Sequence, residues 1–233
     1  MFPAANLTGI DPHENLSMVA ESNAGGPAQL MPSIYQIKPR FQALLRPLVR
    51  GLAAEGVTAN QVTLAAAVMS IAAGVVLAKW AYVPAVWFLL PAVLFVRMAL
   101  NAIDGMLARE HGQKSPLGAY LNELCDVISD AALYLPFALI PGVEPMVIVI
   151  AVILAAVSEM AGVIAIQVGA ERRYDGPAGK SDRAVAFGAA ALTVGLGFWG
   201  EPSNLTWWIG LVAVMTAWTI VNRVRAGLRQ VKA

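Results

Sequence analysis

Six apolar stretches follow one another along the chain after about residue 60, separated by short polar segments or segments rich in glycine and proline. Each stretch is about long enough for a helix to cross roughly 30 Å of hydrocarbon. The pattern therefore predicts an all-α, polytopic membrane protein with six transmembrane helices. We place these spans near residues 61–78, 82–106, 117–140, 144–169, 184–200 and 205–225.

Two segments of different character precede the first span. Residues 1–32 are polar and lack the basic and apolar regions of a secretory signal, so we expect a flexible N-terminal tail. From about 33 to 55, apolar residues recur at helical spacing with basic residues among them. This pattern predicts an amphipathic helix on the membrane surface, with a solvated helix packed on the protein as the alternative. We expect residues 33–233 to form one membrane domain, in which Thr58 or Asn60 caps the first span.

Composition and charge fit this class. Apolar residues make up 58% of the chain and charged residues only 13%, which excludes an ordinary soluble domain. The net charge is +1, but nearly all basic loop residues fall on one side of the membrane under the six-span topology. The positive-inside rule then places both termini and the loop after the second span in the cytoplasm. No basic tract is interleaved with exposed aromatic residues, so nucleic acid is not an expected partner.

A cluster of polar side chains interrupts the apolar pattern around the loop between the second and third spans. Asn101 and Asp104 share one face of the second span, and Asn122, Asp126 and Asp130 share one face of the third. Two helices joined by a short turn pack antiparallel, so these faces can meet. Ionisable groups in or beside a membrane segment usually mark a site. Oxygen ligands gathered there suit a hard divalent cation such as Mg²⁺ or Mn²⁺.

The same stretch resembles the signature of the CDP-alcohol phosphatidyltransferase family. That signature is Asp-x2-Asp-Gly-x2-Ala-Arg, eight residues, and Gly-x3-Asp-x3-Asp. The eight-residue gap is intact, and the matching positions are Asp104, Gly105, Ala108, Arg109, Gly118 and Asp126. Asn101 and Asn122 stand where the family has its first and third Asp. A bacterial branch of the family carries Asn at both positions, and the chain is similar to that branch.

The resemblance implies an enzyme of phospholipid synthesis in the bacterial inner membrane, with its active site facing the cytoplasm. It would transfer a phosphatidyl group from CDP-diacylglycerol to a small alcohol acceptor and release CMP, with Mg²⁺ or Mn²⁺ as cofactor. Asp126 carries over as the general base. Members of the family commonly pair, so a homodimer is implied. Because two carboxylates are missing, the alternative to an enzyme is a catalytically degenerate membrane protein that binds nucleotide-lipid or regulates a partner.

The expected metal ligands are Asp104 and Asp126, with Asn101 and Asn122 coordinating through their amide oxygens. Asp130 or Glu123 is a candidate to supplement this set. A buried, hydrogen-bonded structural role is the alternative for Asp130.

Small residues and one cation in the signature predict a nucleotide site. Gly105, Ala108 and Gly118 would let a nucleotide approach the helix backbone closely, and Arg109 is placed to meet phosphate. Tight packing between membrane helices is the alternative reason for the small residues.

A second basic cluster follows the fourth span and contains Arg172, Arg173, Lys180 and Arg183. These side chains could bind a phosphorylated acceptor or the donor diphosphate. Charge that sets the membrane topology is the alternative. Glycerol 3-phosphate is the preferred acceptor because of this basic loop, while serine, an inositol phosphate or another alcohol remain open.

Two further ionisable residues lie inside predicted spans. Glu159 is in the middle of an apolar run, so it should face the interior of the helix bundle. A polar contact between Glu159 and Arg97 is one arrangement that the sequence allows.

Overall fold

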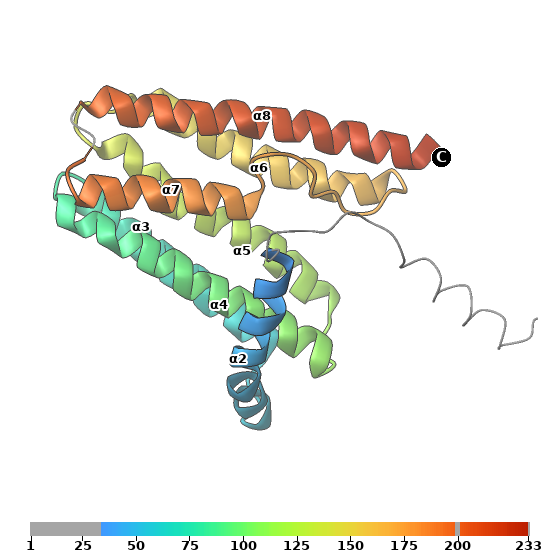
Figure 1. Cartoon of the computed structure of the whole chain (residues 1–233). Coiled ribbons are helices and arrows are strands. Elements are labelled where there is room, and N and C mark those ends of the chain that lie inside the picture. The colour runs from blue at the N-terminus through green and yellow to red at the C-terminus, as the bar shows by residue number, and fades with distance from the viewer. Residues whose placement is uncertain (1–33, 199–200, 233) are drawn as a thin grey trace, which may run out of the picture. The chain divides into compact units, whose positions relative to one another are not determined.

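The computed structural model of the chain describes residues 34–198 and 201–232, with side chains from residue 40 onward. Every regular element in these ranges is a helix, as Figure 1 shows, so the all-α prediction is confirmed for them. The predicted tail, residues 1–32, and the end of the fifth predicted span lie outside the described residues. The elements are α2 (Ile34–Ala54), α3 (Ala59–Lys79), η2 (Pro84–Phe88), α4 (Leu89–Glu110), α5 (Pro116–Tyr134), η3 (Leu135–Leu139), α6 (Pro145–Gln167), α7 (Lys180–Gly195) and α8 (Pro202–Lys232), where η marks a short 3-10 helix.

Four helical segments of the described chain are long and apolar enough to cross a membrane. They are Ala59–Lys79, Pro84–Glu110, Pro145–Gln167 and Pro202–Lys232. Helix α5 carries Asn122, Glu123, Asp126 and Asp130 along its 19 residues, and α7 has only 16 residues. Four apolar segments of this length agree with a chain that crosses a bilayer several times, while the count of six spans stays a prediction.

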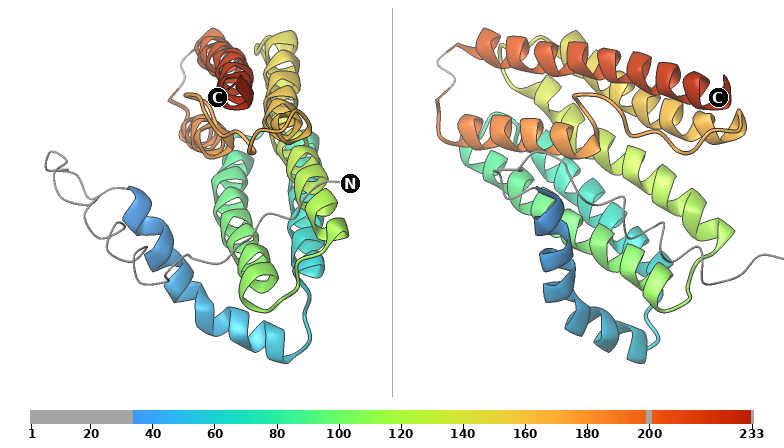
Figure 2. Two further views of the ribbon diagram at one scale, coloured as in Figure 1. Left: turned by 90° about the vertical axis from the view of Figure 1, so that its right-hand side faces the viewer. Right: turned by 45° about the vertical axis from the view of Figure 1, so that its right-hand side comes forward.

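The chain divides into two units, Met1–Phe41 and Gln42–Ala233, and the helices of the second unit are described by themselves. Within it, α6 packs along α8, and α3 packs against both α4 and α5 (Figures 1 and 2). The main apolar core joins these layers at the end of the helices where η2 and η3 lie. There Trp87 packs on Phe137 with ring centroids 4.3 Å apart, and Tyr134 stacks on Phe187 at 4.0 Å. The polar cluster is therefore held by helices whose other ends are fixed by large apolar side chains.

The loops around the signature are shaped by local hydrogen bonds. Thr58 is the N-cap of α3, because its side chain accepts from the backbone N of Gln61 while the Gln61 side chain accepts from the backbone N of Thr58. Of the two candidate caps, Thr58 is the one used. After α4, Gly112 takes a positive φ of 68°, which only glycine adopts without cost. Ser115 then caps α5 by accepting from the backbone N of Gly118 at 3.0 Å.

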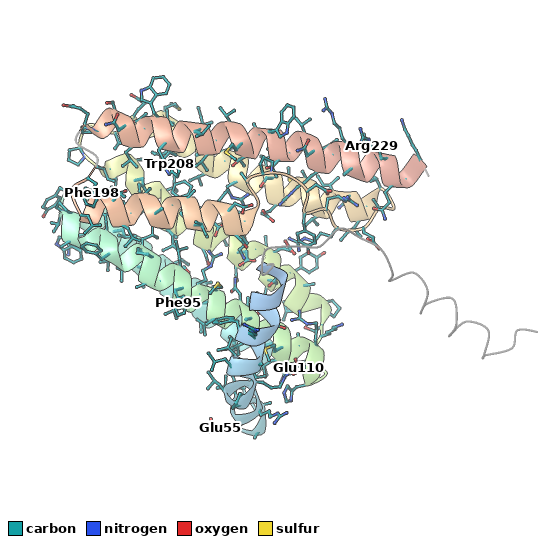
Figure 3. The ribbon with its side chains drawn as sticks, viewed as in Figure 1. Glu55, Phe95, Glu110, Phe198, Trp208 and Arg229 are labelled. Atoms are coloured by element: carbon teal, nitrogen blue, oxygen red, sulfur yellow. The ribbon has the colours of Figure 1, made fainter. Side chains whose placement is uncertain are left out.

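The same end of α4 is tied to α2 by an ion pair. Glu110, labelled in Figure 3, accepts hydrogen bonds from Arg46 Nε at 3.1 Å and Nη2 at 3.0 Å. On α8, Trp208 and Arg229 mark opposite ends of the helix in the same view. That this basic end of α8 faces the cytoplasm stays a prediction.

Gly74 allows α3 and α5 to approach closely. A Cβ at this position would lie 2.2 Å from the backbone oxygen of Ala132, which cannot rotate away. We expect Gly74→Ala to lower the free energy of unfolding by about 1–3 kcal/mol, the usual cost of overpacking. Gly51→Ala is the matched control, because a Cβ at Gly51 meets nothing within 4 Å. Thermal unfolding in detergent compares the two variants, and equal melting temperatures would contradict the close approach.

Candidate active site

The two signature faces meet between α4 and α5, as the spacing predicts. Asn101 of α4 donates from Nδ2 to Asp126 Oδ1 of α5 at 3.2 Å. Asp104, one turn further along α4, is only 5% exposed, and its Oδ2 accepts from the Thr63 hydroxyl of α3 at 2.7 Å. Three helices therefore converge on the two carboxylates that the sequence singled out.

A cavity of about 510 Å³, which we call the motif cavity, opens beside these residues. Its wall includes Asp104, Gly105, Ala108, Arg109, Gly118 and Asn122. Both glycines are in places where a side chain would intrude. A Cβ at Gly105 would lie 3.1 Å from the Arg109 guanidinium nitrogens, and one at Gly118 would lie 2.9 Å from the Asn60 side-chain oxygen. The residues predicted to meet a nucleotide thus line one shared space.

Asp126 is held by groups from two other helices. Its Oδ1 accepts from Arg97 Nη2 at 3.1 Å as well as from Asn101. Its Oδ2 pairs with the ammonium of Lys180 at the start of α7. Lys180 starts that helix because Asp182 accepts from the backbone N of Gly179 at 2.9 Å, which caps the first turn. The predicted base therefore presents one oxygen to α4 and the other to α7.

Asp130 lies one turn further along α5 and is 5% exposed. Its Oδ1 accepts from Arg97 Nη1 at 2.5 Å, and its Oδ2 is 3.9 Å from Arg183 Nη2. It does not border the motif cavity. Glu123, the other candidate extra ligand, borders that cavity and is ion-paired with Arg172. Whether either carboxylate ligates a metal stays a prediction, but Asp130 faces cations of the protein itself.

A second polar cavity of about 390 Å³ adjoins the first at Asn122, and we call it the basic cavity. Its wall includes Asn122, Asp126, Glu159, Arg172, Lys180 and Arg223. Two of the four predicted acceptor-binding residues, Arg172 and Lys180, therefore border it. Arg223 of α8 joins them and is only 2% exposed. Arg223 was not predicted to line this space, because it occurs in a basic C-terminal stretch that membrane topology alone accounts for.

The other two predicted acceptor residues lie outside the wall of the basic cavity. Arg183 is buried and donates to Ser158 Oγ and the Ala178 backbone oxygen, both at 2.9 Å, which ties α7 to α6. Arg173 donates from Nε to Asp175 at 2.8 Å in the loop after α6. That hydrogen bond lowers the pKa of the Asp175 carboxyl below its ordinary value.

Glu159 faces the bundle interior, as predicted, and is 8% exposed. Its carboxylate forms ion pairs with three arginines: Arg183 Nη2 at 2.8 Å, Arg223 Nη1 at 3.3 Å and Arg172 Nη2 at 3.6 Å. Arg97 takes Asp126 and Asp130 as its partners instead of Glu159. The sequence contained a signal for this pairing: Arg97 precedes Asn101 by four residues, so both side chains lie on the same face of the helix.

A third cavity of about 600 Å³, the apolar cavity, runs between α4 and α7. Leu94, Phe95, Met98, Val185 and Leu192 contribute to its wall, and Phe95 can be followed in Figure 3. Its polar members include Arg97, Asn101 and Lys180. Since Lys180 also borders the basic cavity, an apolar space and a cationic space meet at this residue.

The oxygen ligands at the signature are of the chemical type that one hard divalent cation prefers. Over residues 40–198 and 201–232, no three His, Cys, Asp or Glu side chains form a metal-ligand group. What the cluster offers is the carboxylates of Asp104 and Asp126 and the amides of Asn101 and Asn122. All four supply oxygen, which Mg²⁺ and Mn²⁺ prefer, and such ions often keep several waters or substrate phosphates as further ligands.

Comparison with known proteins identifies the family. The sequence profile of the CDP-alcohol phosphatidyltransferase family matches residues 56–220. The chain therefore belongs to the CDP-alcohol phosphatidyltransferase family, and its enzyme class is that of the family. It is 46% identical over 197 residues to the inner membrane protein YnbA of Escherichia coli K12, which covers 84% of this chain and 96% of that protein.

Solved structures of one enzyme share the fold. Phosphatidylinositol phosphate synthase from Mycobacterium tuberculosis with CDP-diacylglycerol bound has a TM-score of 0.65 and 25% identity, over 79% of this chain and 92% of that one. The same enzyme with manganese and citrate has a TM-score of 0.64 and 23% identity, over 78% of this chain and 88% of that one.

Proposed function

We propose that this protein transfers a phosphatidyl group from CDP-diacylglycerol to a small alcohol acceptor and releases CMP. The observation that carries the proposal is that the basic cavity, which Asp126 borders, adjoins both other cavities. The motif cavity and the basic cavity share Asn122, and the basic cavity and the apolar cavity share Lys180. A lipid-linked nucleotide needs an apolar space for its chains and a polar space for its nucleotide, with the reacting phosphate between them.

The donor would use two of these spaces. Its acyl chains suit the apolar cavity, whose wall is formed by α4 and α7. Its cytidine and diphosphate suit the motif cavity, where Gly105, Ala108 and Gly118 leave room and Arg109 supplies positive charge. The synthase that binds CDP-diacylglycerol has a similar fold, which supports this choice of donor.

Asp104, Asp126, Asn101 and Asn122 would hold one divalent cation, Mg²⁺ or Mn²⁺. When bound, this ion supplies positive charge for the diphosphate and the leaving CMP. With two amides in place of two carboxylates, the site carries less negative charge, so we propose one cation. Asp130 borders neither polar cavity, so we leave it out of this set. Glu123 borders the motif cavity and stays a candidate ligand beside its ion pair with Arg172.

Asp126 would act as the general base. It takes the proton of the acceptor hydroxyl while that oxygen forms a bond to the phosphorus that bears diacylglycerol. The bond from this phosphorus to the oxygen of CMP breaks, and CMP leaves with the electron pair. Arg97 and Lys180 lie against the two oxygens of Asp126 and would hold its carboxylate in place while it accepts the proton.

The acceptor would bind in the basic cavity through Arg172, Lys180 and Arg223. These three cations share the cavity wall with the carboxylates of Asp126, Glu159 and Asp182, and they are the groups that would meet a phosphate on the acceptor. Glycerol 3-phosphate remains our preferred candidate. Serine, an inositol phosphate and another alcohol are the alternatives. Arg173 and Arg183, which are held by other partners, would support the loop and α7 instead of touching the acceptor.

CMP release tests the proposal. Purified protein in liposomes receives CDP-diacylglycerol, Mn²⁺ and each acceptor in turn, and an acceptor-dependent release of CMP is expected. Binding of Mn²⁺ and CDP-diacylglycerol without turnover for any acceptor would favour the degenerate, nucleotide-lipid-binding alternative, which the amides at Asn101 and Asn122 support. Absence of binding would contradict both functions.

Arg172→Gln is expected to weaken acceptor binding. A hydrogen bond to a charged group contributes roughly 1.5–3 kcal/mol, so the KM for a phosphorylated acceptor should rise by roughly 10–100-fold with a smaller effect on the KM for CDP-diacylglycerol. Arg225→Gln is the control, because Arg225 is exposed on α8 and borders none of the three cavities. Steady-state CMP release measures both constants. An unchanged KM for the acceptor would remove Arg172 from the site.

The membrane arrangement that we propose keeps six spans, with both termini and the site in the cytoplasm of a bacterium and the protein in its inner membrane. It treats residues 33–233 as one membrane domain with a surface helix over about 33–55, after a tail of residues 1–32. The inner-membrane relative supports the location. We also propose a homodimer, and native mass spectrometry from detergent, which would give twice the monomer mass, tests it.

A further inference from the structure

Arg97 is a charged residue inside an apolar, membrane-length segment, and the proposed transfer step does not use it directly. It is 4% exposed and lies on α4, one turn before Asn101. A charge in such a segment is costly and persists where it has partners and a task. Its partners are all on α5: Asp130 Oδ1 at 2.5 Å, Asp126 Oδ1 at 3.1 Å and the Asp126 backbone oxygen at 3.0 Å.

The guanidinium therefore bridges one full turn of α5. Its planar fork can donate to two carboxylates in fixed directions, which an ammonium cannot do. Arg97 and Asn101 together hold Asp126 Oδ1 from the α4 side. The other oxygen, Oδ2, is left facing Lys180 and the basic cavity. The orientation of the Asp126 carboxylate is thus set by α4.

Asp130 is the second carboxylate that holds the Arg97 guanidinium. It borders neither the motif cavity nor the basic cavity, so it has no route to the substrates proposed for them. The cations that face it from neighbouring helices are Arg97 of α4 and Arg183 of α7, and Glu159 of α6 shares a small cavity with it. A buried guanidinium with only one carboxylate beside it would be free to turn toward that one, whereas two carboxylates a turn apart fix its plane.

We propose that Arg97 and Asp130 form a positioning pair that aims Asp126 Oδ2 at the acceptor hydroxyl. This inference rests on the proposed transfer reaction. In it Arg97 and Asp130 are positioning residues, and Asp126 remains the group that takes the proton. Small errors in the direction of a reacting group can cost up to about 100-fold in rate without changing how tightly substrates bind.

The test separates kcat from KM in Asp130→Asn, Arg97→Lys, Arg97→Gln and the double variant that combines Arg97→Gln with Asp130→Asn. We expect each single variant to lower kcat by roughly 10–100-fold, with both KM values within about twofold of the wild type. Because the two residues act as one unit, the double variant should lose little more than either single variant. It also removes both buried charges together, and its melting temperature shows whether the fold survives.

Three results would overturn the inference. An unchanged kcat in Asp130→Asn would leave the pair with a purely structural role. A raised KM for CDP-diacylglycerol at an unchanged kcat in Arg97→Lys would make Arg97 a donor-binding residue in the apolar cavity. A wild-type protein that binds donor and Mn²⁺ but releases no CMP would contradict the proposed reaction and the inference together, and this outcome is distinct from an active wild type with active variants.

Discussion

Asp126→Asn is expected to reduce CMP release by about 10²–10⁴-fold, the range over which a general base contributes to a reaction. Asparagine has nearly the same shape as aspartate but cannot take the acceptor proton. The structure adds a second reason for a large effect. Lys180 and Arg97 both lie against this carboxylate, so the amide would leave two cations facing each other across the site.

The measurement is CMP release at saturating donor and acceptor, with Mn²⁺ present. Glu144→Gln serves as the control for loss of one acid, since Glu144 is at the N-terminus of α6 and borders none of the three cavities. The melting temperature of Asp126→Asn must be compared with that of the wild type to separate catalysis from folding. A folded Asp126→Asn variant with near wild-type turnover would exclude Asp126 as the base.

Asp104→Asn should strongly weaken Mn²⁺ binding at the site and lower the turnover rate with it. Of the four proposed ligands, only Asp104 and Asp126 carry charge, so the variant removes half of the negative charge available to the ion. We expect Mn²⁺ affinity to fall by at least about 100-fold, the upper end of what loss of an outer partner of a ligand does. Isothermal titration with Mn²⁺ measures this independently of any acceptor.

Thr63→Val is the matched variant for Asp104. The Thr63 hydroxyl donates to Asp104 at 2.7 Å, so valine keeps the carboxylate and removes only the group that orients it. We expect a loss of affinity of about tenfold, the lower end of the same range. Retained Mn²⁺ affinity in Asp104→Asn would remove Asp104 from the ligand set. Equal losses in both variants would indicate that orientation alone controls binding.

The structure shows what surrounds the two asparagines of the signature. Asn101 donates to Asp126, which a carboxylate at that position could not do while both were ionised. Asn122 borders both polar cavities, where its amide can accept or donate. Beside these two amides, the cations Arg97 and Lys180 lie against Asp126.

Much of the molecule follows from sequence because the determining interactions are local. Apolar runs of membrane length predicted helices that overlap α3, α4, α5, α6, α7 and α8. The spacing of Asp104 and Asp126 around a short turn predicted that two helix faces meet, because helix periodicity and an antiparallel turn leave few alternatives. The resemblance to the family, carried by the same residues, gave the enzyme class.

What the sequence could not decide involves partners that are distant along the chain. Membrane-length apolar runs do not specify which neighbour each helix packs against, so nothing local indicated that Lys180 would reach Asp126 or that Arg223 would reach Glu159. Arg97 had several possible acids within the bundle, and the packing of α4 and α5 on the same helix, α3, brought it to Asp126 and Asp130. Local sequence thus determined the helices and the reactive residues, while tertiary packing decided which cation lies against which carboxylate, because ion pairs between helices depend on their arrangement in space.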